Sequence, residues 1–191
     1  MSPAHRDPTL GDLGEFRVIR EVIEPALANS GAAGERGDDA GLAQTAGGER
    51  IVVTCDVAVR PAVWDLVQDP WESWGWYAVA GSLSDLAAAG ASPLAIVTSI
   101  EAPAELAASD LARFCAGMGA ACRELGVPHV GGNLREAGIF ACHSTVIGDL
   151  EGMPMIGRSG CRPGDVLAVV GPCGAFAAAY FDARRAGFES L

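Results

Sequence analysis

The sequence contains no lysine, so all 13 of its basic residues are arginines. A Walker A loop needs its lysine on the nucleotide phosphates, and this absence excludes a P-loop. Any nucleotide phosphate bound by this chain must be neutralised by metal ions, arginine or backbone N–H groups. There are only three histidines, and the six cysteines form no Cys-x-x-Cys pair, which disfavours a zinc site. Because most of these cysteines lie in apolar runs, we expect them to be small core residues.

Long apolar runs are also missing. The sequence has no apolar stretch of about 18 residues and no apolar N-terminal signal segment, which predicts a soluble, cytoplasmic protein. The formal net charge of -11 argues against nucleic acid and anionic membranes as partners, because both require a positive surface. Hydrophobic residues make up 50% of the 191 positions, enough for one core of ordinary size or for one domain plus part of another.

Hydrophobic periodicity predicts alternating helices and strands. Helices are expected over 14–28, over 71–89 and from Leu111 to Leu125, and strands over 50–56, Leu94–Ile100, Val127–Val130 and Ile139–Ile147. Residues 29–48 are expected to form a loop, and Gly131-Gly132-Asn133 a turn between the last two strands. This order predicts an α+β fold, a mixed β-sheet with helices packed on one face.

Several residues are expected to cap these helices. Asp12 and Glu15 resemble a capping box, Ser109 is a candidate N-cap, and Gly90 and Gly126 would end their helices. The 71–89 helix is expected to turn one face to the core and a smooth face away from it. The core face would hold Trp76, Val79, Ala80, Leu83, Leu86 and Ala87, and the smooth face Ala78, Gly81, Ser82 and Asp85.

The C-terminal residues are predicted to begin a second domain. A turn-rich stretch over 158–165 is followed by an expected strand, Val166–Val170, and a helix, Ala175–Arg185. A strand and a helix cannot bury their own faces alone. We therefore expect residues 1–157 to form an N-terminal domain, and residues 158–191 to form a boundary turn and the truncated start of a second, α/β domain.

Three carboxylates stand in different elements, Asp39 in a loop, Asp56 at a strand end and Asp85 in a helix. Bringing them together would cost several kcal/mol in like-charge repulsion unless cations lie between them. Magnesium suits such a set, since it takes hard oxygen ligands, keeps waters and bridges to substrate phosphates. The alternative interpretation makes each a solvated loop acid or a helix cap, and Asp38 a residue that only positions its loop.

Four short acidic or amide-bearing segments follow one another in a fixed order. They are Gly37-Asp38-Asp39-Ala40, Thr54-Cys55-Asp56, Leu83–Gly90 and Val130-Gly131-Gly132-Asn133, with Gly14-Glu15-Phe16 before them and Arg158-Ser159-Gly160 after them. In this order they resemble the thiamine-monophosphate kinase family and, more broadly, the aminoimidazole ribonucleotide synthetase superfamily. The resemblance covers about residues 11 to 185, the first half or so of a typical family member, and Leu83–Gly90 is its most specific segment.

The resemblance implies a Mg²⁺-dependent kinase that converts thiamine phosphate and ATP, its co-substrate, to thiamine diphosphate and ADP. It also implies a homodimer in which the N-terminal domains pair to close a β-barrel. By the resemblance, Asp39, Thr54, Asp56 and Asp85 match metal-ligand positions, and Gly131, Gly132, Asn133 and Arg158 match nucleotide-binding positions. No catalytic base is assigned, because phosphoryl transfer needs positioning and charge neutralisation more than a base.

Two alternatives stay open. Asn133 stands where the kinases usually have a metal-binding aspartate, and Val63 where they typically have a substrate-contacting histidine. These differences favour a paralogue of the superfamily that uses ATP to activate another acceptor. The other alternative is a non-catalytic nucleotide-binding or dimerisation module, because the family's C-terminal half lies outside this sequence.

Overall fold

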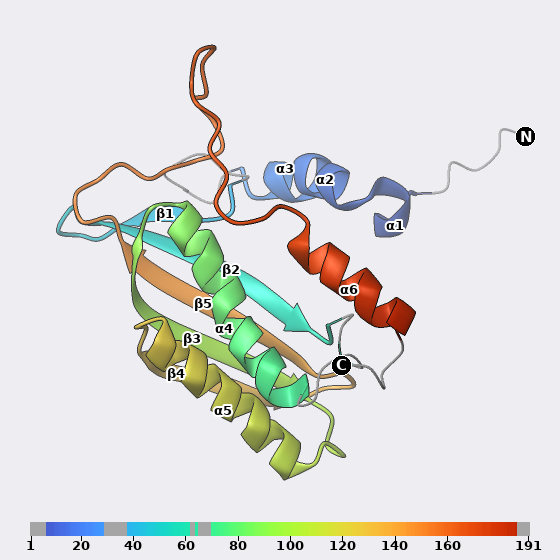
Figure 1. The fold of residues 1–191 in the computed structure, drawn as a ribbon. Helices are drawn as coiled ribbons and strands as arrows, with labels where there is room; N and C mark the ends of the chain where they lie inside the picture. The colour runs from blue at the N-terminus through green and yellow to red at the C-terminus, as the bar shows by residue number, and fades with distance from the viewer. Residues whose placement is uncertain (1–6, 29–37, 62–63, 65–69, 187–191) are drawn as a thin grey trace, which may run out of the picture.

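The computed structural model describes residues 7–28, 38–61, 64 and 70–186. Its centre is a five-stranded sheet with the order β1-β2-β5-β3-β4. The strands are β1 (Gly41–Gln44), β2 (Arg50–Val59), β3 (Ser92–Ala102), β4 (His129–Glu136) and β5 (Ala141–Asp149). All neighbouring strands pair antiparallel except β3 and β4, which are parallel. Helices α4 (Pro70–Ala88) and α5 (Ala108–Glu124) lie on one face of this sheet (Figure 1), so the predicted mixed α+β architecture is confirmed.

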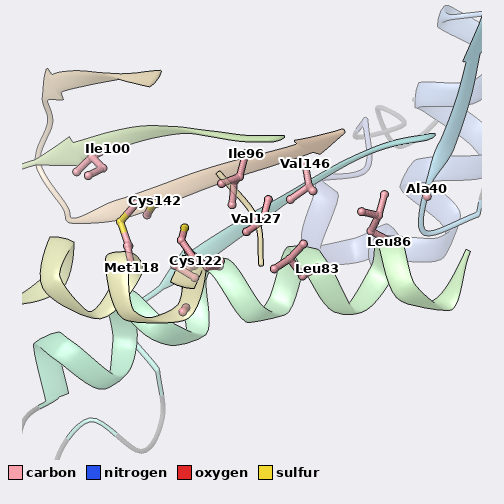
Figure 2. Packing of buried hydrophobic residues seen from close by; sticks show 14 of the residues in the cluster. Ala40, Leu83, Leu86, Ile96, Ile100, Met118, Cys122, Val127, Cys142 and Val146 are labelled. Atoms are coloured by element: carbon pink, nitrogen blue, oxygen red, sulfur yellow. The ribbon is translucent and has the colours of Figure 1, made fainter. Parts of the chain in front are cut away.

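The hydrophobic core lies between this face and the two helices. Along β5 the even-numbered residues are buried and the odd-numbered residues after Ala141 are half-buried, the two-residue period expected of a strand covered on one side. Val146 pairs with Thr54 of β2 and with Ile96 of β3. Figure 2 shows Leu83 and Leu86 of α4 between that helix and the strands that carry Val146 and Ile96.

Helices α4 and α5 approach each other through two glycines. A Cβ atom on Gly75 would lie 1.9 Å from the carbonyl oxygen of Phe114, and one on Gly117 would lie 1.9 Å from that of Glu72. Each glycine therefore faces the carbonyl three residues before the other glycine. No side chain fits at either position, and this reciprocal contact fixes where the helices cross.

The tryptophans near the start of α4 pack against each other and against α5. Trp74 is buried, stacks on Trp71 with ring centroids 5.5 Å apart, and meets Phe114 of α5 edge to face at 5.6 Å. Trp76 instead lies at the surface and donates its indole N–H to Glu124 at 3.1 Å, which adds a second link between α4 and α5.

The bounds of α4 agree with the predicted helix, but its predicted core face is partly wrong. Val79, Leu83 and Leu86 are buried as expected, whereas Trp76, Ala80 and Ala87 are not. The buried face also includes Trp74, Ala78 and Ser82. The helix carries small apolar residues around its whole circumference, so its sequence does not distinguish the face that meets the sheet.

Two of the predicted helix ends are confirmed and one cap is wrong. Gly90 has a φ of 76° and donates its N–H to Ala87, and Gly126 has a φ of 69° just beyond α5. Both conformations favour glycine at a helix C-terminus. Ser109 is not the N-cap of α5, because the helix begins at Ala108 and its N-cap is Ala107, which forms no side-chain hydrogen bond.

The N-terminal helix differs from the predicted 14–28. It consists of α1 (Leu10–Leu13), α2 (Glu15–Val18), a π-helical turn η1 (Ile19–Ile23) and α3 (Glu24–Ala26). The capping box is formed by Thr9 and Asp12, not by Asp12 and Glu15, because the Thr9 hydroxyl accepts the N–H of Asp12 and the Asp12 carboxylate accepts that of Thr9. None of these helical residues is buried, and Phe16 is 81% exposed.

Four strand predictions need correction. The predicted 29–48 loop contains β1, while residues 29–37 lie outside the described residues. Strand β2 continues to Val59, so Asp56 is inside the strand. Gly131-Gly132-Asn133 lies within β4 and pairs with β3, so no turn forms there. Val166–Val170 forms no strand, since no neighbouring strand pairs with it among the described residues, and Val166 is 91% exposed.

The C-terminal helix α6 (Ala175–Ala186) confirms the predicted Ala175–Arg185 helix. The expectation that most cysteines belong to the core is wrong, since only Cys122 and Cys142 are buried and the other four are exposed. Within the described ranges, no helix has both the length and the apolar character needed to cross a bilayer.

Candidate metal and nucleotide site

The buried hydroxyl of Thr54 joins three parts of the chain. Its Oγ1 donates to the backbone carbonyl of Asp39 at 3.0 Å and lies 3.5 Å from Oδ2 of Asp85. Asp39 precedes β1, Thr54 belongs to β2 and Asp85 to α4. The alternation of β2 turns Thr54 toward α4 and makes this contact possible.

Asp56 lies on the same face of β2, two residues after Thr54. Its Oδ1 accepts the N–H of Val57 at 2.7 Å, and its Oδ2 lies 3.5 Å from the position that a Cβ on Gly81 would occupy. Gly81 is one helical turn before Asp85, so the small residue lets Asp56 approach the helix. Asp39, Thr54, Asp56 and Asp85, which were predicted as metal ligands, are thus brought together around one end of α4.

The carboxylates of this cluster lie close enough to affect one another's ionisation. Partial burial raises the pKa of Asp85, and the nearby carboxylates of Asp39 and Asp56 raise it further. Among the described residues, no group of three or more acidic, histidine or cysteine side chains lies close enough together to hold a metal ion by itself. The donors nevertheless fit magnesium, which keeps several waters and binds proteins through one or two carboxylates together with substrate phosphates.

Asp38 and Arg158 lie beside the cluster. The Arg158 N–H donates to Oδ2 of Asp38 at 2.9 Å, and the Arg158 guanidinium is 3.5 Å from Oδ1 of Asp38 and 3.8 Å from Oδ1 of Asp39. The N–H groups of Arg158 and Asp39, together with the Arg158 charge, lower the pKa of Asp38. A small cavity of about 80 Å³ lies here, and its lining includes Asp38, Asp39, Asp85, Gly157 and Arg158. A phosphate that entered it would meet carboxylates as well as one arginine.

The other predicted nucleotide-binding residues, Gly131, Gly132 and Asn133, lie elsewhere. They belong to β4, which is separated from β2 by β5 and β3. Three interstrand spacings amount to roughly 14 Å. Gly132 is held against β3, where a Cβ would come 2.1 Å from the carbonyl oxygen of Thr98. Within one copy of the chain, the structure does not bring these three residues to the acidic cluster.

A larger cavity, which the sequence did not predict, adjoins the cluster. It measures about 670 Å³ and lies between the end of β2, the first half of α4 and α6. Arg60, Trp74, Tyr77, Phe176 and Tyr180 are among its lining residues. The Tyr77 ring and the Asp56 carboxylate both lie within 4 Å of a Cβ position on Gly81, so the cavity begins where the acidic cluster ends.

Arg60 is the only side chain with a formal charge among the described lining residues of this cavity. Its guanidinium lies 5.1 Å from the ring centroid of Trp64, within the range of a cation–π interaction. The one sequence signal for the cavity was an arginine next to proline and a nearby tryptophan, directly after the acidic motif of β2. Val63, which matches the family's substrate-contacting position, lies outside the described residues.

Comparison with protein-family models identifies one domain. The family described as AIR synthase related protein, N-terminal domain, matches residues 37–150. The curated thiamine-monophosphate kinase of Mycobacterium tuberculosis is 37% identical over 183 residues, which cover 94% of this chain and 54% of the relative. That of Corynebacterium glutamicum is 33% identical over 173 residues, which cover 90% of this chain and 51% of the relative.

Solved structures give a similar result. AaThiL complexed with AMPPCP and TMP aligns with a TM-score of 0.69 and 27% sequence identity, covering 82% of this chain and 48% of that chain. Thiamine monophosphate kinase from Aquifex aeolicus aligns with a TM-score of 0.65 and 26% identity, covering 81% and 48%. The chain thus spans about half the length of the curated relatives it matches.

Proposed function

Because this chain belongs to the AIR synthase related protein family and contains its N-terminal domain, we propose that it is the ATP- and Mg²⁺-binding part of a thiamine-monophosphate kinase. The reaction transfers the terminal phosphoryl group of ATP to thiamine phosphate and yields thiamine diphosphate and ADP. The observation that supports it best is the convergence of Asp39, Asp56 and Asp85 around Thr54. The reaction belongs in the cytoplasm.

Each part of the site has a separate role in this proposal. Asp39, Thr54, Asp56 and Asp85 would hold magnesium, which would neutralise phosphate charge when bound. Arg158 contacts the nucleotide phosphates from the neighbouring loop. Phosphoryl transfer passes through a loose transition state, so holding the two substrates in line and neutralising charge account for most of the catalysis.

The large cavity is the place for the acceptor. Its aromatic side chains provide flat apolar surfaces for a heteroaromatic ring, and Arg60 provides the positive charge that a phosphate needs. Because the cavity adjoins Asp56, an acceptor phosphate bound in it would lie beside the acidic cluster.

A homodimer completes the proposal. The sheet face opposite α4 and α5 carries apolar side chains, including the half-buried Val53 and Ile147, and a second copy pairing there would close a β-barrel. The nucleotide-binding role of Gly131, Gly132 and Asn133 then requires the second copy or the family's C-terminal half. Residues 1–157 form the ATP/Mg-binding domain, and residues 158–191 form the boundary and the start of the next domain.

Calorimetric titration with Mg²⁺ and AMPPCP, repeated in EDTA and with the Asp85→Asn variant, tests this function. We expect saturable, metal-dependent binding that is weakened at least about tenfold in the variant, since a lost charged contact contributes roughly 1.5–3 kcal/mol. Glu105→Gln, which removes one exposed carboxylate from the loop before α5, is the matched control and should bind normally. Metal-independent binding, or an unchanged Asp85→Asn variant, would contradict the proposed site.

The amide of Asn133 and the side chain of Val63, at positions where the family usually has an aspartate and a histidine, favour a second candidate, a paralogue that uses ATP to activate a different acceptor. An amide there supplies one negative charge fewer to a metal than an aspartate. Turnover assays with thiamine phosphate and with other phosphorylated acceptors separate the two candidates. Nucleotide binding without any turnover would support the non-catalytic module instead.

A further inference from the structure

Both oxygens of the Asp38 carboxylate already accept hydrogen bonds from backbone N–H groups. Oδ1 accepts the N–H of Asp39 at 2.9 Å, and Oδ2 accepts the N–H of Arg158 at 2.9 Å. The Arg158 guanidinium adds an ion pair to Oδ1 at 3.5 Å. The Asp38 side chain is only 17% exposed, and both of its carboxylate oxygens are hydrogen-bonded within the protein.

The segment that carries Arg158 is shaped to receive Asp38. A Cβ on Gly157 would lie 2.7 Å from Oδ2 of Asp38, so the carboxylate approaches the backbone where glycine leaves room. Ile156 donates its N–H to the carbonyl of Ala89 at 3.0 Å. Residues 156–158 are therefore fixed between the C-terminal end of α4 and the loop before β1.

This arrangement determines where the Arg158 side chain can reach. Its Nη1 lies 3.8 Å from Asp39, one of the carboxylates of the acidic cluster. Without Asp38, the Arg158 backbone N–H would lose the carboxylate that accepts it and the guanidinium would lose one ion pair, so the long side chain would gain rotamer freedom. An arginine that must meet a phosphate gains affinity when it is held in place beforehand.

We propose that Asp38 is a positioning residue, which holds Arg158 beside the acidic cluster and does not itself bind metal. The inference rests on the proposed nucleotide site. The two neighbouring aspartates then have different roles, because Asp39 faces the acidic cluster and Asp38 faces the 156–158 segment.

The test compares Asp38→Ala, Arg158→Ala and the double variant in the full chain, using calorimetric titration with Mg²⁺ and AMPPCP. We expect Asp38→Ala to weaken binding about tenfold or more, and the double variant to bind no more weakly than Arg158→Ala alone, because both changes remove the same contact. Asp165→Ala is the control, since Asp165 also accepts an arginine N–H in a loop, from Arg162 at 2.8 Å, and should bind normally.

Amide hydrogen exchange of Arg158 without any ligand gives a separate result. Its N–H should be protected in the wild type and should exchange faster in Asp38→Ala, while the melting temperature falls no more than in Asp165→Ala. Unchanged exchange, or losses that add in the double variant, would overturn the positioning role. A wild type that binds no Mg²⁺ and AMPPCP would overturn the proposed function itself, whereas a binding wild type with an unchanged Asp38→Ala variant would overturn only the inference about Asp38.

Discussion

Replacing Gly75 or Gly117 by alanine should destabilise the domain, because each glycine touches a backbone carbonyl of the other helix. The added Cβ would lie 1.9 Å from an oxygen, whereas C···O contacts normally measure about 3.3–3.6 Å. The helices would have to move apart by about 1.4 Å. Overpacking of this kind costs typically about 1–3 kcal/mol, and alanine recovers about 0.5–1 kcal/mol through its better helix propensity.

We therefore expect a net loss of roughly 1 kcal/mol, and at most about 2.5 kcal/mol, in the free energy of unfolding. For a chain of this size, that loss lowers the melting temperature by about 2–8 °C in a calorimetric scan. Gly119→Ala is the matched control on α5, because its Cβ would meet only the movable Arg123 side chain at 3.5 Å. This control should gain about 0.5–1 kcal/mol.

The double variant sharpens the test. A single separation of α4 from α5 relieves both clashes, so Gly75→Ala and Gly117→Ala together should cost less than the sum of their separate effects. If Gly75→Ala melted at or above the temperature of Gly119→Ala, the reciprocal glycine contact could not be what fixes the crossing of the helices.

Three other changes give clear expectations. Asp85→Asn should raise the free energy of unfolding at neutral pH by a few tenths of a kcal/mol in denaturant titrations. The pKa of Asp85 is raised in the folded protein, so ionisation of Asp85 destabilises the fold as the pH rises through that pKa. Added Mg²⁺ should raise the melting temperature of the wild type but not of the variant. Burial raises the pKa of Cys142 from 9.0 to about 11, so the stability that its neutral thiol contributes should be lost as the pH rises from about 9 to about 11. If the difference in free energy of unfolding between the wild type and Cys142→Ala stayed constant over that interval, the expectation would be wrong. Gly157→Ala should displace the Asp38 carboxylate and weaken Mg-AMPPCP binding, whereas Gly138→Ala, with no atom within 4 Å of its Cβ, should bind as the wild type does.

The sequence was most informative where one physical signal dominated. The bounds of α4 and the C-terminal end of α5 followed from long apolar patterns ended by glycines with left-handed backbone, whereas the start of α5 was misplaced by about one turn. The ordered acidic motifs predicted the family, which the match over residues 37–150 confirms. They also predicted that Asp39, Asp56 and Asp85 would meet, and the pKa of Asp85 is raised first by partial burial and then by the nearby carboxylates of Asp39 and Asp56. Their role as metal ligands stays a prediction.

The errors arose where partners distant in the sequence decide the structure. Gly131-Gly132-Asn133 has the composition of a turn, but pairing with β3 extends it into an edge strand. The apolar run Val166–Val170 has the composition of a strand, but no strand pairs with it among the described residues. The order of the strands, which separates β4 from the acidic cluster, depends on pairings that no local pattern records.

The order of the strands also determines when this domain can fold during synthesis. Strand β2 pairs with β5, and the contact between Cys55 and Thr145 joins residues 90 positions apart. The unit from β3 to β5 is continuous in the chain, so it can form once residue 149 has left the ribosome, whereas residues 54–59 of β2, which lie beyond its pairing with β1, have no partner strand through most of that time. Thr54 and Asp56 belong to this late-pairing part of β2. The acidic cluster is therefore assembled among the last parts of the domain, and cation binding by a nascent chain would report that the whole sheet is in place.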